Sequence, residues 1–215
     1  MCSSDLRTHA EREQVQRAVE AWRESKPDAL ALDLESTIFA PALNRWVPSY
    51  AAHQQAMAVE RAASDALDDG DGRFDAAARA WLATLRDEAG RSRTAEITTI
   101  VGMAVSEMLK LPPRDELVRV GRLFAQQGER PDLRGDEARL GELQLAAEAL
   151  GKLVKTDEEA LRAKLAAGQV HAQTTAAFDR AYRKLLRTLE PLIGREAIAA
   201  AFPRFQRTKA STPAG

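Results

Sequence analysis

Apolar residues recur at helical spacing along almost the whole chain, and this periodicity limits the fold more than any other feature. Phe178, Tyr182, Leu185 and Leu189, for example, form one stripe along a helix. No segment alternates apolar and polar residues over a useful length, as a half-buried strand would. The sequence therefore predicts an all-α fold: a bundle of roughly six to eight helices, several joined as antiparallel hairpins, with no sheet.

Proline, glycine and capping residues divide this pattern into separate predicted helices. Pro48 is expected to end a region of short helical segments, and the segment 68–72 is expected to be a turn. Thr156 fits a capping box that opens a new helix, and Pro191 follows the last strong helix. The other expected helices span about 7–26, 49–67, 73–89, 94–109, 113–126, 136–153, 169–190 and 195–205.

We assign residues 7–207 to a single helical domain, with a sub-boundary expected near 128–135, and residues 208–215 to a disordered tail. Residues 1–6 are expected to be a non-native leader. Residues 2–6, Cys-Ser-Ser-Asp-Leu, are what the end of a common sequencing adapter encodes when translated. On this interpretation the natural gene begins before Arg7, and the chain is the C-terminal part of a longer protein.

Composition narrows the function classes. The 31 basic and 32 acidic residues nearly balance, so global charge argues neither for nor against nucleic acid, which is not the partner that we favour. Cys2 is the only cysteine, which excludes a disulfide framework and cysteine-ligated zinc. No segment has the length and apolarity of a membrane span. We expect a bacterial, cytoplasmic protein.

One acidic segment has part of the pattern of a calcium loop. Asp69, Asp71 and Asp75 match the third, fifth and ninth positions of an EF-hand loop. Leu67 and Ala78, however, stand where that loop needs its first and twelfth carboxylates. We therefore interpret the segment as an acidic, glycine-rich turn between helices, with calcium binding as the less favoured alternative, and we favour no metal or cofactor site.

Other catalytic and metal-binding motifs are missing. None of the three histidines has the Glu-x-x-His spacing of a di-iron bundle, and neither a nucleophile elbow nor a phosphate-binding loop occurs. His53 and Glu60 lie seven residues apart, on one face of a predicted helix, and could hold a metal only with help from elsewhere. A histidine at the surface or the core boundary is the favoured interpretation.

The predicted helix near residues 178–193 has a basic face opposite its apolar stripe. Arg180, Arg183, Lys184 and Arg187 form this face. It could contact an anion, an acidic partner or nucleic acid. The favoured alternative is a solvated face balanced by acidic residues elsewhere, because no recognition-helix motif accompanies it.

Two segments of the chain resemble each other. Residues 74–91 and 178–195 align in one register, beginning with Phe-Asp in both and ending with Gly-Arg in both. A duplicated helical hairpin would produce this similarity, and so would the shared composition of helices rich in alanine, leucine and arginine. The flanking residues do not align, which favours shared composition.

Residues 108–120, Met-Leu-Lys-Leu-Pro-Pro-Arg-Asp-Glu-Leu-Val-Arg-Val, carry a resemblance to a known family. They resemble a signature of polyhydroxyalkanoate synthase accessory subunits and phasins, in which an apolar helix ends in a Leu-Pro-x-Arg-x-(Asp/Glu)-(Leu/Val) element. Leu111, Pro112, Arg114 and Glu116 or Leu117 match it in kind. The chain then turns at residues 128–135, where the family usually continues as a heptad helix or a tail rich in alanine and lysine. The resemblance implies a non-catalytic helical protein that binds a polymer granule or a synthase.

These observations favour a non-enzymatic helical domain for interaction, assembly or regulation. Its partner would be another protein or a second copy, bound through apolar helix faces. Trp22, Trp46 and Trp81 are expected as anchors of the core or of an interface. The alternatives are the granule-associated protein above, and a ligand-binding protein or enzyme with a pocket between helices.

Overall fold

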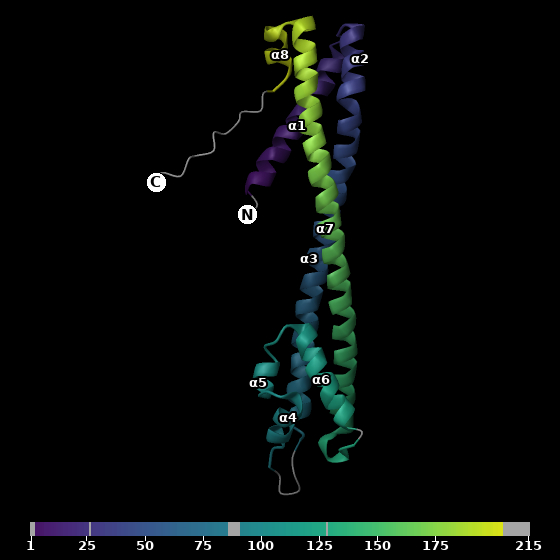
Figure 1. Cartoon of the computed structure of the whole chain (residues 1–215). Helices are drawn as coiled ribbons and strands as arrows, with labels where there is room; N and C mark the ends of the chain where they lie inside the picture. The colour runs from purple at the N-terminus through teal and green to yellow at the C-terminus, as the bar shows by residue number, and fades with distance from the viewer. Residues whose placement is uncertain (1–2, 26, 86–90, 128, 204–215) are drawn as a thin grey trace, which may run out of the picture. The chain divides into compact units, whose positions relative to one another are not determined.

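The computed structural model describes residues 3–25, 27–85, 91–127 and 129–203, with side chains from residue 9 onward. The described residues form eight α-helices and one short 3₁₀ helix, and they contain no strand (Figure 1). The predicted all-α class is therefore confirmed. No helix among the described residues is long and apolar enough to cross a membrane.

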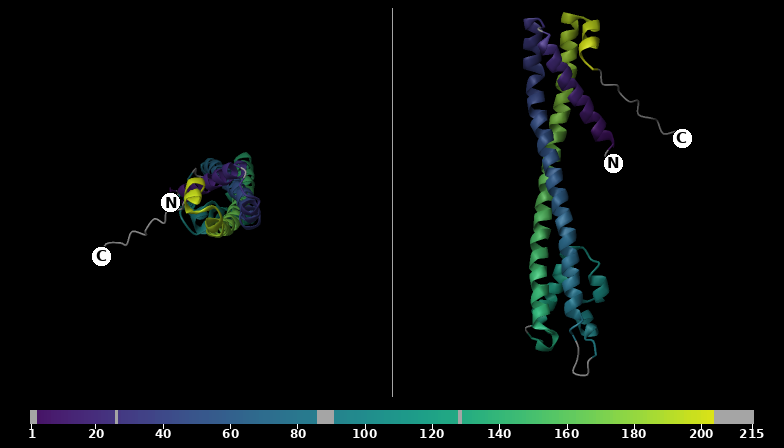
Figure 2. Two further views of the ribbon diagram at one scale, coloured as in Figure 1. Left: turned by 90° about the horizontal axis from the view of Figure 1, so that it is seen from above. Right: turned by 180° about the vertical axis from the view of Figure 1, so that it is seen from behind.

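The chain divides into two compact units, which we describe separately. Unit 1 comprises residues 1–53 and 168–215, and unit 2 comprises residues 54–167. Two long helices, α3 (Ala40–Leu82) and α7 (Glu137–Ile193), contribute to both units. Within each unit they lie side by side and antiparallel (Figures 1 and 2). The loop near 128–135, where a sub-boundary was expected, lies inside unit 2.

Unit 1 packs around aromatic side chains. It contains α1 (Ser3–Glu24), α2 (Ala29–Ile38), α8 (Arg195–Ala201) and the adjoining parts of α3 and α7. Trp46 and Phe178 bring α3 and α7 together, with ring centroids 5.1 Å apart. The buried core consists of Val15, Val19, Trp22, Ala31, Phe39, Leu43, Trp46, Phe178, Tyr182, Leu185, Leu189, Ile198 and Phe202.

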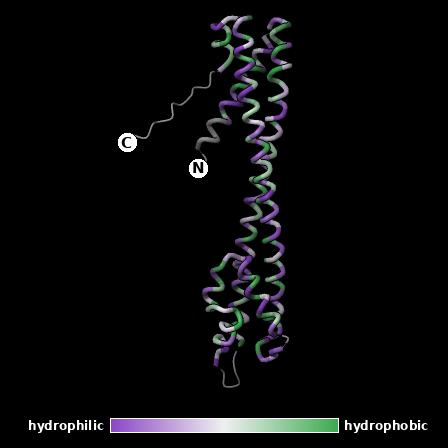
Figure 3. Tube along the Cα trace, viewed as in Figure 1, coloured by the Kyte–Doolittle hydropathy of each residue, from purple (hydrophilic) through white to green (hydrophobic). Residues whose placement is uncertain are grey.

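Unit 2 has a separate, mostly aliphatic core. It contains α4 (Thr94–Val101), α5 (Val105–Met108), α6 (Pro113–Gln127), the 3₁₀ helix η1 (Pro131–Leu133) and the remaining parts of α3 and α7. Figure 3 shows hydrophobic and hydrophilic residues interspersed along these helices. The buried core consists of Phe74, Ala78, Trp81, Leu85, Ile97, Val101, Val105, Met108, Val120, Leu123, Leu133, Leu140, Leu143, Ala147 and Leu150.

The turn predicted at residues 68–72 is wrong, because this segment lies inside α3. Gly70 is buried, and a Cβ added to it would collide with the Leu153 side chain of α7. The glycine therefore permits two helices to approach closely rather than a chain reversal. The break predicted at Pro48 is also wrong, because α3 continues through this proline.

The breaks predicted within α7 are wrong as well, because 57 residues form one helix. Thr156 does not cap a new helix. Its hydroxyl donates to the Lys152 carbonyl oxygen at 3.1 Å, a bond that a threonine in a helix interior makes to the preceding turn. Pro191 lies inside the last turn of the same helix rather than beyond its end.

The single helix predicted over 94–109 is instead two helices, α4 and α5. Gly102 separates them with a φ of 79°, in the left-handed region where glycine costs least. Arg119 of α6 donates to the Val101 carbonyl oxygen at 2.8 Å. This bond satisfies a carbonyl at the end of α4 and ties α4 to α6.

The two similar segments bury the same positions. Phe74, Ala78, Trp81 and Leu85 lie in the unit 2 core. Their counterparts in the alignment, Phe178, Tyr182, Leu185 and Leu189, lie in the unit 1 core. The shared spacing of four, three and four residues is also what two helices that bury one stripe have in common, so it favours neither origin of the similarity.

Candidate functional site

The candidate site of unit 2 is built on α6 and the beginning of α7. Pro113 occupies the first position of α6, where its fixed φ suits a helix and no backbone N–H is needed. Val120 and Leu123 then anchor the helix in the core. At the start of α7, the Asp136 carboxylate accepts a hydrogen bond from the Arg139 backbone N–H at 2.9 Å, as an N-cap does.

The connection between α6 and α7 is held against α3. The Trp81 indole N–H donates to the Arg134 carbonyl oxygen at 2.8 Å. The Asp136 backbone N–H donates to the Thr84 hydroxyl at 3.2 Å. Gly135 lies between them with a φ of 64°, and a Cβ there would stand 2.7 Å from the Thr84 hydroxyl oxygen. This position therefore requires glycine.

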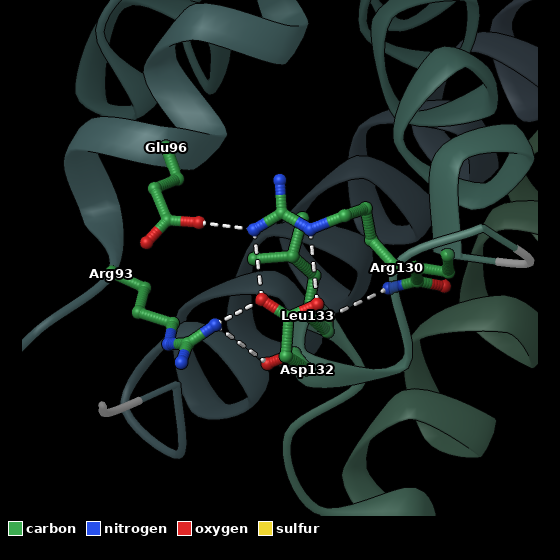
Figure 4. Close-up of polar contacts among 6 residues, drawn as sticks. Arg93, Glu96, Arg130, Asp132 and Leu133 are labelled. Atoms are coloured by element: carbon green, nitrogen blue, oxygen red, sulfur yellow. Dashed lines mark hydrogen bonds and ion pairs between the residues drawn. The ribbon is translucent and has the colours of Figure 1, made fainter. Parts of the chain in front are cut away.

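An ion-pair network joins the same connection to α4 (Figure 4). The Arg130 guanidinium binds Glu96 at 2.6 Å and Asp132 at 2.8 Å, and Arg93 also binds Asp132. The hydrogen bond from Arg130 is the main reason that the pKa of Asp132 falls to about 2. The network lies at the surface, so we interpret it as positioning η1 rather than as a reactive group.

Two open pockets lie between α6 and α7. One is a cavity of about 340 Å³ near Gln127 and Leu140, and the other a cavity of about 500 Å³ near Leu117 and Ala147. Both are lined by Phe124 and Gln144, so they adjoin. We call the two together the α6–α7 groove. Its remaining lining residues are Val120, Gly121, Arg134, Glu137, Gly141 and Glu148.

Large apolar side chains stand exposed beside the α6–α7 groove. Leu145 of α7 is 69% exposed, and it lies one turn from the lining residues Gly141 and Glu148. Val118 of α6 is 55% exposed and lies one turn from Gly121. Nothing within 4 Å would meet a Cβ at either glycine. The chain therefore leaves exposed apolar side chains beside an uncrowded groove, whose lining is mainly apolar near Leu117 and Ala147 and mainly polar near Gln127 and Glu137.

No protein-family model, curated protein or solved structure matches the chain.

Beneath α6, three carboxylates come together. Glu116 is fully buried, and neither of its oxygens has a donor partner among the described residues. One carboxylate oxygen of Asp71 and one of Asp75, both on α3, are likewise buried without a donor. Burial, followed by the negative charges of Asp71 and Asp75, raises the pKa of Glu116 to about 8. The same environment, burial first, raises the pKa of Asp71.

The structure separates the three residues predicted as calcium ligands. Asp71 and Asp75 lie on the inner side of α3 near Glu116, whereas Asp69 is exposed. The loop on which the calcium interpretation rested is not formed, because these residues belong to a continuous helix. Among the residues that the structure describes, no three His, Cys, Asp or Glu side chains are placed to hold a metal ion.

Glu116 is not among the site residues predicted from the sequence. The buried residues of α6 are Glu116, Val120, Leu123 and Gln127, which are four, three and four residues apart. A glutamate on the apolar stripe of a helix was therefore a readable signal.

The three histidines of the chain gather in unit 1. His9 stacks on Tyr50 with ring centroids 3.4 Å apart, and His53 stacks on His171 at 5.6 Å. His171 also lies 3.4 Å from the Ser49 hydroxyl oxygen. Glu60, which the sequence paired with His53, instead binds Lys164 at 2.8 Å. The histidines are thus part of an aromatic cluster at the edge of the unit 1 core.

The predicted basic face is exposed on α7 within unit 1. Arg180, Arg183, Lys184 and Arg187 all lie at the surface. Arg183 donates to the Asp179 carbonyl oxygen at 3.1 Å, a contact within the same helix. The exposure of the four side chains is consistent with either a solvated face or a partner-binding face, so a role in binding an anion or a partner stays a prediction.

Proposed function

We propose that the chain is a non-enzymatic helical assembly module, in which unit 2 pairs with unit 2 of a second copy. The observation that carries this proposal is the exposed Leu145 beside the α6–α7 groove. The exposed leucine and the mainly apolar part of the groove near Leu117 and Ala147 provide the two halves of a self-complementary contact. In a twofold dimer, Leu145 of each copy would enter the groove of the other.

The groove suits a helix of a second copy better than a small polar substrate. Gly121 and Gly141 leave space where other residues would carry a Cβ, so a second helix could approach the backbone. The lining near Leu117, Val120 and Ala147 is apolar, and Glu148 stands at its side. This is the arrangement of an interface with an apolar centre and a charged rim.

Sedimentation of the full chain over a range of concentrations tests the proposal. We expect a monomer–dimer equilibrium that Leu145→Gln weakens by roughly a hundred- to ten-thousandfold, because the substitution removes both of the leucine side chains that a twofold dimer would bury. Leu165→Gln is the matched control. Leu165 lies on the same helix, is exposed to 59%, and lines neither pocket.

Two results would overturn the proposal. One is a wild-type chain that stays monomeric at all concentrations tested, which would leave the groove for a different partner. The other is a dimer that Leu165→Gln disrupts and Leu145→Gln does not, which would place the contact on another face of α7.

A further inference from the structure

We propose that Glu116 is a proton-operated latch that holds α6 against α3 while its carboxyl group is protonated. The inference rests on the buried cluster of Asp71, Asp75 and Glu116 and does not depend on self-association. The cluster contains buried carboxylate oxygens that have no donor partner among the described residues. Buried polar atoms nearly always have a partner, so this cluster needs an explanation.

A proton on Glu116 supplies the missing donor. The protonated carboxyl group can donate to the facing Asp71 carboxylate, which then serves as the acceptor. One oxygen of Glu116 and one of Asp71 then have each other as partners, and the three carboxyl groups carry two negative charges instead of three. A cation could play the same part, but no three acidic or histidine side chains in the described part of the chain are placed to bind one.

The charged groups around Glu116 do not compensate for ionisation. From α3, it faces Asp71, Asp75 and the Arg79 guanidinium. Arg79 is mostly exposed and is already bound to Asp75 at 2.5 Å. On α6 itself, Arg114 pairs with Glu158 of α7 at the surface, and Arg119 bonds to the Val101 carbonyl oxygen of α4. One cation therefore faces three carboxylates.

The direction of the pH dependence follows from the raised pKa of Glu116. Its pKa is about 8 in the closed state and returns to about 4.5 when α6 is released into water. Between about pH 4.5 and pH 8, Glu116 therefore keeps its proton while α6 is packed against α3 and loses it when α6 is released. The free energy by which Glu116 stabilises the packing of α6 against α3 is fully present below about pH 4.5. It decreases as the pH rises toward about 8 and changes little above that pH.

Amide hydrogen exchange of α6 at a series of pH values tests the latch. After correction for intrinsic exchange, we expect the protection of residues 113–127 to fall roughly tenfold per pH unit between about pH 5 and 8. In Glu116→Gln, which keeps the shape of the side chain but cannot ionise, this slope should vanish. Glu159→Gln, at an exposed position of α7, is the matched control and should keep the wild-type slope.

Three outcomes would overturn the latch. The first is wild-type protection of α6 that does not change with pH, and the second is the same slope in Glu116→Gln. The third is protection at about pH 8 that Ca²⁺ or Mg²⁺ restores in the wild type but not in Glu116→Gln, since a cation would then be the natural occupant. If Glu116→Gln fails to fold, carboxyl NMR of the wild type decides: a Glu116 midpoint near 4.5 excludes the latch.

Discussion

At the scale of single residues, Asp132 shows how a surface side chain acquires unusual chemistry from its neighbours. The guanidinium groups of Arg130 and Arg93 both donate to its carboxylate. Because these bonds favour the ionised form, the pKa of Asp132 falls from 3.8 to about 2, with the Arg130 bond as the largest cause. The contribution to stability is present above about pH 4 and is lost as the pH falls toward 2.

Replacing Arg130 with Gln should raise the Asp132 pKa toward 3.8, because the main donor is removed. Carboxyl NMR titration measures the midpoint directly. Arg114→Gln, which removes an exposed arginine that pairs with Glu158 instead, should leave the midpoint at about 2. A wild-type midpoint near 3.8 would show that the network in Figure 4 does not form in solution.

At the scale of elements, two glycines have opposite roles. Gly135 joins η1 to α7 with a positive φ and has the Thr84 and Leu85 side chains against the position of its absent Cβ. Gly72 lies inside α3 with nothing within 4 Å of that position. The first glycine is required by the backbone, whereas the second only weakens a helix.

Gly135→Ala should therefore lower the free energy of unfolding by at least about 1–2 kcal/mol, because the left-handed conformation and the crowding both oppose a methyl group. Gly72→Ala should raise it by about 0.5–1 kcal/mol through helix propensity. Urea denaturation of the two variants measures both changes. A loss of stability in Gly72→Ala would mean that residues 68–72 form a turn, contrary to the continuous α3.

The sequence predicts which elements are helical better than it predicts where they end. The all-α class and the burial of Trp22, Trp46 and Trp81 are confirmed, because both follow from apolar periodicity. Gly70 and Thr156 misled the prediction, because each carries a local signal that tertiary packing overrides. Close approach of α7 explains the glycine, and a bond to the preceding turn explains the threonine.

The candidate site was less predictable than the fold. The calcium pattern pointed to Asp71 and Asp75, yet their partner Glu116 lies some forty residues away and meets them only through folding. The α6–α7 groove depends on how two helices separate, which periodicity does not encode. The basic face of α7 was predictable because it lies on one helix and needs no tertiary information.

At the scale of the whole molecule, the separate cores predict separate responses to mutation. In unit 1, Glu35 is almost fully buried and is bound by Arg23 through two hydrogen bonds of 2.8 Å and 2.6 Å. Arg23→Met would leave that carboxylate without its partner. Because Arg23 itself is partly exposed, we expect a loss of only about 1–3 kcal/mol in unit 1.

Hydrogen exchange resolves where this loss falls. Peptides from α1 and α2 should lose protection in Arg23→Met, whereas peptides from α4 and α6 should keep theirs. Arg17→Met, at an exposed position of α1, is the control and should change neither unit. Equal losses in both units would contradict the independence of the two cores.

The order of the two units along the chain has a consequence for synthesis. Residues 54–167 of unit 2 are contiguous, whereas unit 1 is made from segments on both sides of them. As the chain leaves the ribosome, unit 2 has all its residues before Phe178 or Tyr182 emerges. The apolar faces of α1 and α2 can therefore complete their core only with the last third of α7, and during that interval their uncovered parts are the surfaces that a chaperone would encounter.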